Sequence, residues 1–349
     1  PSAVDNFTTL KFNFHWDRHF ALSYVNSFQK WYPLLSLLTV HPLIFYILLH
    51  KSGTYGTDIK WGYVVNQICL LVHEFNFSFL FRMVNLIPYA GLYCGGPLCR
   101  TGLPHWMLMK LFQIPLSFTV IAVIPPFQFL LFRMHEMIVS NTQSKIRFSN
   151  RTQAVIMLAQ CVLLSMNVFG FAHFGKDSDD SEELLQRSEL AWLTHRSGTI
   201  FLFGSPGNPE YFIYEVHILT LSITLITPFV CLLAIHSALM IRQQVHHNRT
   251  SSRTQTMKNT VVAVFFTQII GILIFYVSPL VILLLTMVFD FSFLPASILA
   301  YCRFANMPLF LCEPMMLSLI FLFRSPTRKC HKLSLFRNHC GHLLRKRVI

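Results

Sequence analysis

Long runs of apolar residues, separated by short polar segments, are the dominant pattern along the chain. Seven runs are long enough for a helix to cross a bilayer, which takes about 20 residues. They cover approximately residues 31–50, 62–87, 104–132, 152–174, 211–241, 260–289 and 294–323. The pattern predicts an all-α membrane protein, a bundle of seven transmembrane helices between an N-terminal tail (1–30) and a basic tail (324–349).

The seven runs differ in how many charged residues they contain. Asp, Glu, Lys and Arg are absent from 111–132, 216–241 and 259–289, whereas the second run contains Glu74 and Arg82. An intramembrane carboxylate is costly, so the second run is the weakest of the seven by hydropathy. A bundle of six spans, in which 294–323 is a re-entrant segment, stays open as the alternative.

Composition agrees with a membrane protein. Hydrophobic residues make up 53% of the chain, charged residues only 12%, and there are 34 Phe. A soluble protein of this length would have about 25% charged residues. These values exclude an ordinary soluble domain.

Basic residues gather at one end of the predicted bundle. Eighteen of the 28 Lys and Arg lie in alternate loops and in the tail after 323, and seven lie in the opposite segments. By the positive-inside rule, the N-terminus is extracellular and the C-terminus cytoplasmic. The net charge of +13 is then explained by anionic membrane lipid, and no nucleic-acid partner is needed.

Two kinds of covalent modification fit this orientation. Asn6-Phe7-Thr8 is a glycosylation sequon on the predicted outer tail. Cys330 and Cys340 follow the last span among basic residues, where palmitoylation and free thiols are both compatible with the sequence.

Cys94 and Cys99 are the cysteines on the predicted outer side, in the segment CGGPLC. A local bridge between them is compatible with the spacing, and so are two free thiols. The second outer loop, 175–210, contains no cysteine to which either could be joined.

Short motifs along residues 25–328 resemble those of the nematode serpentine chemoreceptors, most closely class I, with class H as the near relative. The matching segments are Lys51-Ser52-Gly53 after the first span, Glu74 in the second, the outer turn with Pro88, Gly91, Tyr93, Cys94 and Gly96, the Arg133-x-His135 motif, Gln268, Pro279 and Phe289-Asp290 in the sixth span, and RSPTRK after the seventh. Arg82, Asn85 and Glu313 depart from the family pattern. The resemblance implies a plasma-membrane receptor on a sensory-neuron cilium that binds a small-molecule cue and signals through a heterotrimeric G protein.

Arg133 and His135 end the third span, and two interpretations apply to them. A cation at this end of a helix complements the helix dipole and reaches lipid phosphates. The family motif favours a second role, at the mouth of a cleft that admits a G protein. Glu136 is the nearby acid with which Arg133 can pair.

Glu74 lies near the middle of the second span, where it needs a partner or a proton. It is interpreted as part of a structural polar contact, and the alternative is an ion or proton site that changes between receptor states.

Ligand contacts are expected from the outer halves of spans 3, 5, 6 and 7, where the helices converge. The candidates are Arg82, Trp106, Lys110, Gln113, Tyr211, Tyr214, Glu215, Tyr276, Tyr301, Arg303 and Asn306. Each could equally serve packing or anchoring at the membrane interface. If Lys110, Arg303 and Glu215 share one cavity, they favour a ligand that carries a carboxylate or an amine.

Catalytic signatures such as Gly-x-Ser-x-Gly, a phosphate loop or His-Glu-x-x-His do not occur in the sequence. The sequence therefore predicts no enzyme, no metal site and no cofactor. A seven-helix ligand-gated channel or a transporter-like protein is the alternative function, although the chain lacks the internal repeat typical of transporters.

Overall fold

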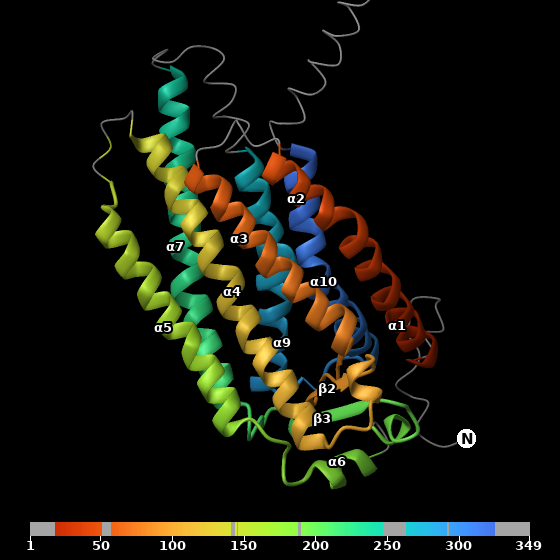
Figure 1. The fold of residues 1–349 in the computed structure, drawn as a ribbon. Helices are drawn as coiled ribbons and strands as arrows, with labels where there is room; N and C mark the ends of the chain where they lie inside the picture. The colour runs from red at the N-terminus through yellow and green to blue at the C-terminus, as the bar shows by residue number, and fades with distance from the viewer. Residues whose placement is uncertain are drawn as a thin grey trace, which may run out of the picture.

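The computed structural model describes residues 18–50, 57–140, 144, 146–187, 190–246, 263–291 and 293–324. These residues form a bundle of long helices that is closed at one end by a small sheet (Figure 1). Six helices are long and apolar enough to cross a membrane: Ser27–His50, Thr57–Phe81, Asn150–Phe174, Ile213–Gln243, Ala263–Val288 and Ala305–Phe323. Helix α4 (His105–Val139), which spans 35 residues, is the seventh long helix of the described part.

The prediction of an all-α membrane bundle is therefore confirmed, with a sheet added. The first helical run comprises α1 (Arg18–Leu35), the π-helical η2 (Ser36–Val40) and α2 (His41–His50). The second comprises α3 (Thr57–His73) and the π-helical η3 (Glu74–Phe81), and the sixth contains η6 (Leu273–Val277) and α9 (Ser278–Val288). The remaining long helices are α5 (Asn150–Phe174), α7 (Ile213–His246) and α10 (Ala296–Arg324).

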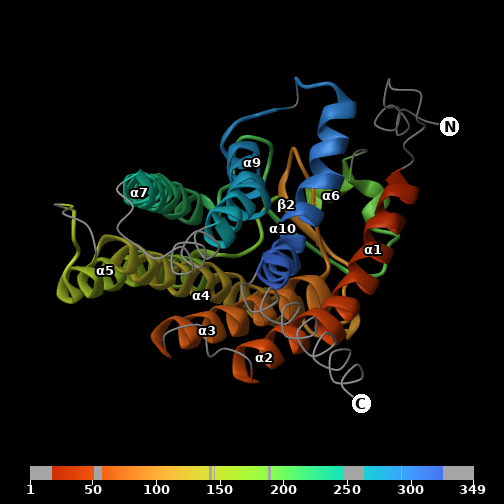
Figure 2. The same cartoon turned by 90° about the horizontal axis from the view of Figure 1, so that it is seen from above.

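Helix α10 occupies the middle of the bundle. Seen from above, it has α1, α2 and α3 on one side and α9 on the other (Figure 2). Helix α7 packs against α4, α5 and α9. Because α10 is one continuous helix of 29 residues, the last apolar run does not turn back as a re-entrant segment would.

Local sequence sets several helix ends. Ser149 caps α5, and its hydroxyl accepts a hydrogen bond from the Thr152 N–H at 3.1 Å, a strong N-cap arrangement. The second helical run ends at Phe81 because Arg82 takes a left-handed conformation, with φ of 48°. Residues 82–87, assigned to the second span from the sequence, therefore leave the helix.

Three antiparallel strands lie across the end of the bundle where α4 begins. They are β1 (Met83–Asn85), β2 (Ala90–Cys94) and β3 (Thr199–Gly204), in the order β1-β2-β3. Every residue of β1 and β2 is buried, and the short helix α6 (Ser181–Gln186) lies beside the sheet. We call this end of the bundle the sheet end and the opposite end, where α4 and α10 finish, the tail end.

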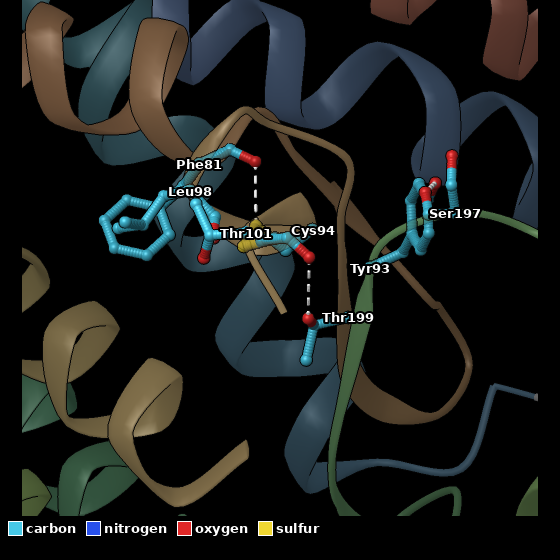
Figure 3. Close-up of a disulfide and its surroundings, with 8 residues drawn as sticks. Phe81, Tyr93, Cys94, Leu98, Thr101, Ser197 and Thr199 are labelled. Carbon is cyan, nitrogen blue, oxygen red and sulfur yellow. Dashed lines mark hydrogen bonds between the residues drawn. A yellow bond between two sulfur atoms is a disulfide. The ribbon is translucent and has the colours of Figure 1, made fainter. Parts of the chain in front are cut away.

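A disulfide joins Cys94 to Cys99, with the two Cα atoms 5.9 Å apart. It links the end of β2 to the turn η4 (Leu98–Arg100), and the Thr199 hydroxyl of β3 donates to the Cys99 carbonyl at 3.1 Å (Figure 3). Nearby, the Tyr93 hydroxyl donates to the Ser197 carbonyl at 2.7 Å. The two loops that supply the strands, more than 100 residues apart, are thereby held together.

Candidate functional site

Glu74 lies in a buried cluster of polar side chains from the first, second and seventh helical runs. Its Oε2 atom is 2.6 Å from His41 Nε2 and accepts a hydrogen bond from the Ser36 hydroxyl at 3.0 Å. All three side chains are fully buried. The carboxylate therefore has partners on the neighbouring helical run, as an intramembrane acid requires.

Further hydrogen bonds extend this cluster to α10. Gln67 contacts His41 Nδ1 and also donates to the Ser318 hydroxyl at 2.9 Å. Tyr32 bonds the Ser78 hydroxyl and the Leu311 carbonyl. We call this set the polar cluster: Tyr32, Ser36, His41, Gln67, Glu74, Ser78 and Ser318.

A second buried acid lies beside the polar cluster. Glu313 on α10 is fully buried, and its carboxylate comes within 4.0 Å of His73 Nδ1, which is too long for a hydrogen bond. Among the described residues, neither its two oxygens nor the His73 ring nitrogens have a hydrogen-bond partner. Sequence reasoning treated Glu313 only as a departure from the family pattern and did not foresee its place beside His73.

An apolar cavity of about 70 Å³ lies between α4, α5, α7 and the sixth helical run. Most of its wall is aliphatic or aromatic, with contributions such as Phe127, Leu219 and Ile272. Two polar groups stand out: the Gln128 amide on α4 and the Tyr276 hydroxyl in η6. Both residues are buried, and these groups have no hydrogen-bond partner among the described residues.

A smaller pocket of about 40 Å³ lies between this cavity and the sheet. Met83 of β1 and Leu92 of β2 line it together with Phe310 and Asn306 of α10. Leu280 lines both spaces, so the pocket adjoins the cavity. The Asn306 amide donates to the Pro279 carbonyl at 3.0 Å, which fixes it against the sixth helical run.

Four candidate ligand residues lie elsewhere, in an open cleft at the sheet end between α4, α5 and α7. Trp106, Lys110, Tyr211 and Tyr214 line this cleft, whose volume is about 570 Å³. Trp106 is 70% exposed, and Lys110 donates to the Ala172 carbonyl at 2.6 Å. These residues face outward and are not brought to the cavity.

A loop contact orders one rim of this cleft. The Tyr211 hydroxyl bonds Asp179, and Lys176 pairs with the same carboxylate at 3.3 Å. Hydrogen bonds from Tyr211 and Lys176 hold the pKa of Asp179 below its usual range. His105 also pairs with Asp177 across the cleft. The cleft is thus a charged surface on which Lys110, His105, Lys176 and Asp179 already have hydrogen-bond or ion-pair partners.

Two other candidates, Glu215 and Arg82, line neither the cavity nor the cleft. Glu215 is fully buried against α5, where a Cβ on Gly170 would come within 2.5 Å of its Oε1 atom. Arg82 lies at the start of the sheet, 6.0 Å from the Phe79 ring centroid. The side chains of Gln113, Tyr301 and Arg303, the sequon at Asn6 and the tail cysteines Cys330 and Cys340 lie outside what the structure describes.

At the tail end, Arg133 pairs within its own helix. Its guanidinium donates to Glu136 at 3.0 Å and to the Asn150 side chain at 3.4 Å, and it lies 5.2 Å from the Phe129 ring centroid. The local pairing with Glu136 is the one considered from the sequence.

His135 turns the other way, into the bundle. It is 2% exposed, and its Nε2 atom lies 2.8 Å from Nδ1 of His236 on α7. His236 Nε2 in turn contacts the Ser144 hydroxyl at 3.2 Å. The two histidines therefore link α4, α7 and the segment after α4.

Sequence reasoning missed His41, Gln67, Gln128 and His236, although each is a polar residue inside an apolar helix. That placement is itself a signal, because such residues face the bundle interior or a cavity. Within the part of the chain that the structure describes, no group of three His, Cys, Asp or Glu side chains could hold a metal ion.

The chain matches a known protein family over most of its length. The model of the family described as serpentine type 7TM GPCR chemoreceptor Srh matches residues 34–324. No curated protein matches the chain.

Proposed function

Because the chain belongs to the serpentine 7TM GPCR chemoreceptor family Srh, we propose that it binds a small-molecule cue within its helix bundle and activates a heterotrimeric G protein at the tail end. The resemblance to nematode serpentine chemoreceptors is confirmed, and the matched class is H, the near relative, rather than class I. The protein is a multi-pass membrane receptor, and its family is one of receptors rather than enzymes.

The observation that carries the proposal is that the same two helices form the cavity and the contact at the tail end. Helices α4 and α7 both line the cavity, and they meet again through His135 and His236. A ligand that changes the spacing of α4 and α7 in the cavity therefore acts on the surface next to Arg133. Coupling of this kind needs a ligand with different affinities for two states of the bundle.

The orientation is also part of the proposal. The sheet end faces outside and the tail end faces the cytoplasm, because the loops and the C-terminal segment that hold 18 of the 28 Lys and Arg join helix ends at the tail end. The proposed location is the plasma membrane of a sensory neuron, at its cilium.

Two measurements test this function. An epitope tag at the N-terminus is expected to be stained on intact cells, and a tag after residue 324 only after permeabilisation. Cells that express the receptor with a promiscuous G protein are expected to respond to a member of a library of small metabolites, and Arg133→Ala is expected to weaken that response. The alternative function is a seven-helix ligand-gated channel. A channel of this kind in the insect type of arrangement has its N-terminus inside the cell, so it predicts the opposite staining. A cue that evokes current without a G protein would overturn the proposal.

A further inference from the structure

The cavity between α4, α5, α7 and the sixth helical run contains no charged residue. Its wall is formed by aliphatic and aromatic side chains together with Gln128, Ser222, Thr227, Cys231 and Tyr276. The charged ligand candidates Lys110 and Glu215 do not line it. A ligand that carries a carboxylate or an ammonium group would lose its hydration here without gaining a partner, which is strongly unfavourable.

Two polar groups in the wall lack partners. The hydroxyl of Ser222 is already used within its own helix, because it donates to the Ile218 carbonyl at 2.7 Å. The Gln128 amide and the Tyr276 hydroxyl are different, because both are buried and have no hydrogen-bond partner among the described residues. A buried unpaired polar group is destabilising, so a molecule that pairs with both gains binding free energy from them.

From these observations, and on the basis of the proposed function, we infer that the cue is a small, neutral, mostly apolar molecule with one carbonyl or hydroxyl group. It binds in this cavity with Gln128 and Tyr276 as its hydrogen-bonding contacts. A carbonyl oxygen accepts from the Tyr276 hydroxyl and from the Gln128 NH₂ group. A hydroxyl can also donate to the Gln128 carbonyl oxygen.

The size of the space limits the ligand. An apolar cavity of about 150 Å³ binds benzene. The cavity here is about 70 Å³ and the adjoining pocket is about 40 Å³, so both are smaller than that. One small ring or a short chain is therefore the upper limit for the ligand, and a ring requires the side chains of the wall to shift outward.

The route into the cavity favours apolar molecules as well. Its wall at α7 and the sixth helical run includes half-buried side chains, among them Thr227, Cys231, Leu273 and Val277. Toward the sheet end, by contrast, buried strands cover the bundle. The cavity therefore comes closest to the surface where these helices face lipid, and a molecule that partitions into lipid can reach it there.

One buried acid lies on the neighbouring helix α10. Glu313 lies there with its carboxylate 4.0 Å from His73 Nδ1, and it is not in the cavity wall. If this carboxylate attracted the ligand, an amine would bind better than a ketone, so the test includes one.

The test measures thermal unfolding of the purified full chain in lipid nanodiscs. The probes share one ring: cyclohexanone, cyclohexanol, cyclohexanecarboxylate and cyclohexylamine. Cyclohexanone and cyclohexanol are expected to raise the Tm, while the carboxylate and the amine do not. Gln128→Leu and Tyr276→Phe are each expected to raise the concentration needed for half of the shift by about three- to tenfold, the factor for one lost hydrogen bond.

Matched controls separate binding from general effects of the probes on the bilayer. Gln160→Leu and Tyr63→Phe make the same exchanges at buried positions that do not line the cavity, and they are expected to leave the concentration dependence unchanged. The inference is overturned if the carboxylate or the amine stabilises more than the ketone. It is also overturned if neither neutral probe stabilises the protein, or if cavity and control variants respond alike.

The outcomes also separate this inference from the proposed function. Binding of cyclohexanone that depends on Gln128, without any G-protein response to a bound probe, supports the site and contradicts the receptor mechanism. A G-protein response to a charged cue that persists in Gln128→Leu supports the receptor and overturns the inference.

Discussion

The two sides of the bundle are held together by different interactions. On one side, the polar cluster connects the first, second and seventh helical runs through side-chain hydrogen bonds, with Glu74 and His41 at its centre. On the other side, α4, α5, α7 and the sixth run enclose an apolar cavity. Hydrogen bonds require a defined geometry. The hydrophobic effect is non-directional, and side chains that line a cavity lack contact atoms on one side. The difference indicates a fixed half and a half that can respond to a ligand.

Both sides use π-helical turns, although for different chemistry. Ser36 and Glu74 begin the π-helical segments η2 and η3, and Tyr276 lies in η6. A π turn inserts an extra residue into a helix and is frequent at functional sites. In one half of the bundle these turns carry polar side chains of the polar cluster, and in the other half the π turn carries a polar side chain of the cavity wall.

The largest expected effect comes from removing the centre of the polar cluster. Glu74→Leu leaves His41 and Ser36 without their buried acceptor and is expected to destabilise the protein by roughly 3 kcal/mol. Thermal unfolding in nanodiscs measures it. Glu136→Leu, at a carboxylate that is half exposed at the tail end, serves as the control and should change the Tm little. Equal Tm values for Glu74→Leu and the wild type would show that the cluster does not fix its half of the bundle.

A smaller change in free energy is expected at the tail end of the half that encloses the cavity, where α4 and α7 meet through His135 and His236. His135→Leu removes the hydrogen bond to His236 and is expected to favour separation of α4 and α7 by about 1 kcal/mol. That corresponds to a roughly fivefold rise in basal G-protein signalling in reporter cells. The matched control variant is His217→Leu. His217 lies on an exposed face of α7, and the one described hydrogen bond of its ring is to its own helix. Basal signalling that is unchanged in His135→Leu would mean that this contact does not restrain the receptor.

The smallest expected change in stability comes from filling the cavity, and it distinguishes an empty space from a packed core. Ser222→Leu fills part of the cavity and is expected to stabilise the protein by about 0.5–1 kcal/mol while it weakens the cyclohexanone shift. Ser237→Leu makes the same exchange on the same helix, at a buried serine that does not line the cavity. Overpacking there is expected to cost about 1–3 kcal/mol. Destabilisation of the same size by both variants would argue that the space around Ser222 is closed.

The helices were predictable from the sequence, and the sheet was not. Apolar length alone identifies a membrane span, since about 20 residues reach across the bilayer whatever their neighbours are. Strand β1 has only three residues, all buried. It pairs with β2, which in turn pairs with β3 more than 100 positions away. No local period distinguishes such a strand from the apolar end of a helix, which is why residues 82–87 were assigned to the second span.

The candidate site was predictable only in part. The sequence predicts an interior position for Glu74, because an intramembrane acid needs a partner. It predicts Tyr276 as a ligand contact because the outer halves of the helices converge there, and both residues are buried in the structure. Lys110 and Tyr214 were selected by their height along the helices, but the helices turn these side chains toward an outer cleft. The direction in which a side chain points depends on how its helix is rotated about its own axis, and the sequence of one helix does not specify that rotation.

The sequence by itself determined that this protein is a membrane bundle of long helices, because the bilayer acts on each apolar run separately and in proportion to its length and composition. Only the tertiary structure decided that Glu74 pairs with His41, that Gln128 and Tyr276 share one cavity, and that Lys110 and Glu215 stay outside it. Those facts depend on how the helices rotate and where π turns shift their faces. Such choices are made by packing between distant segments, so no single run of residues encodes them.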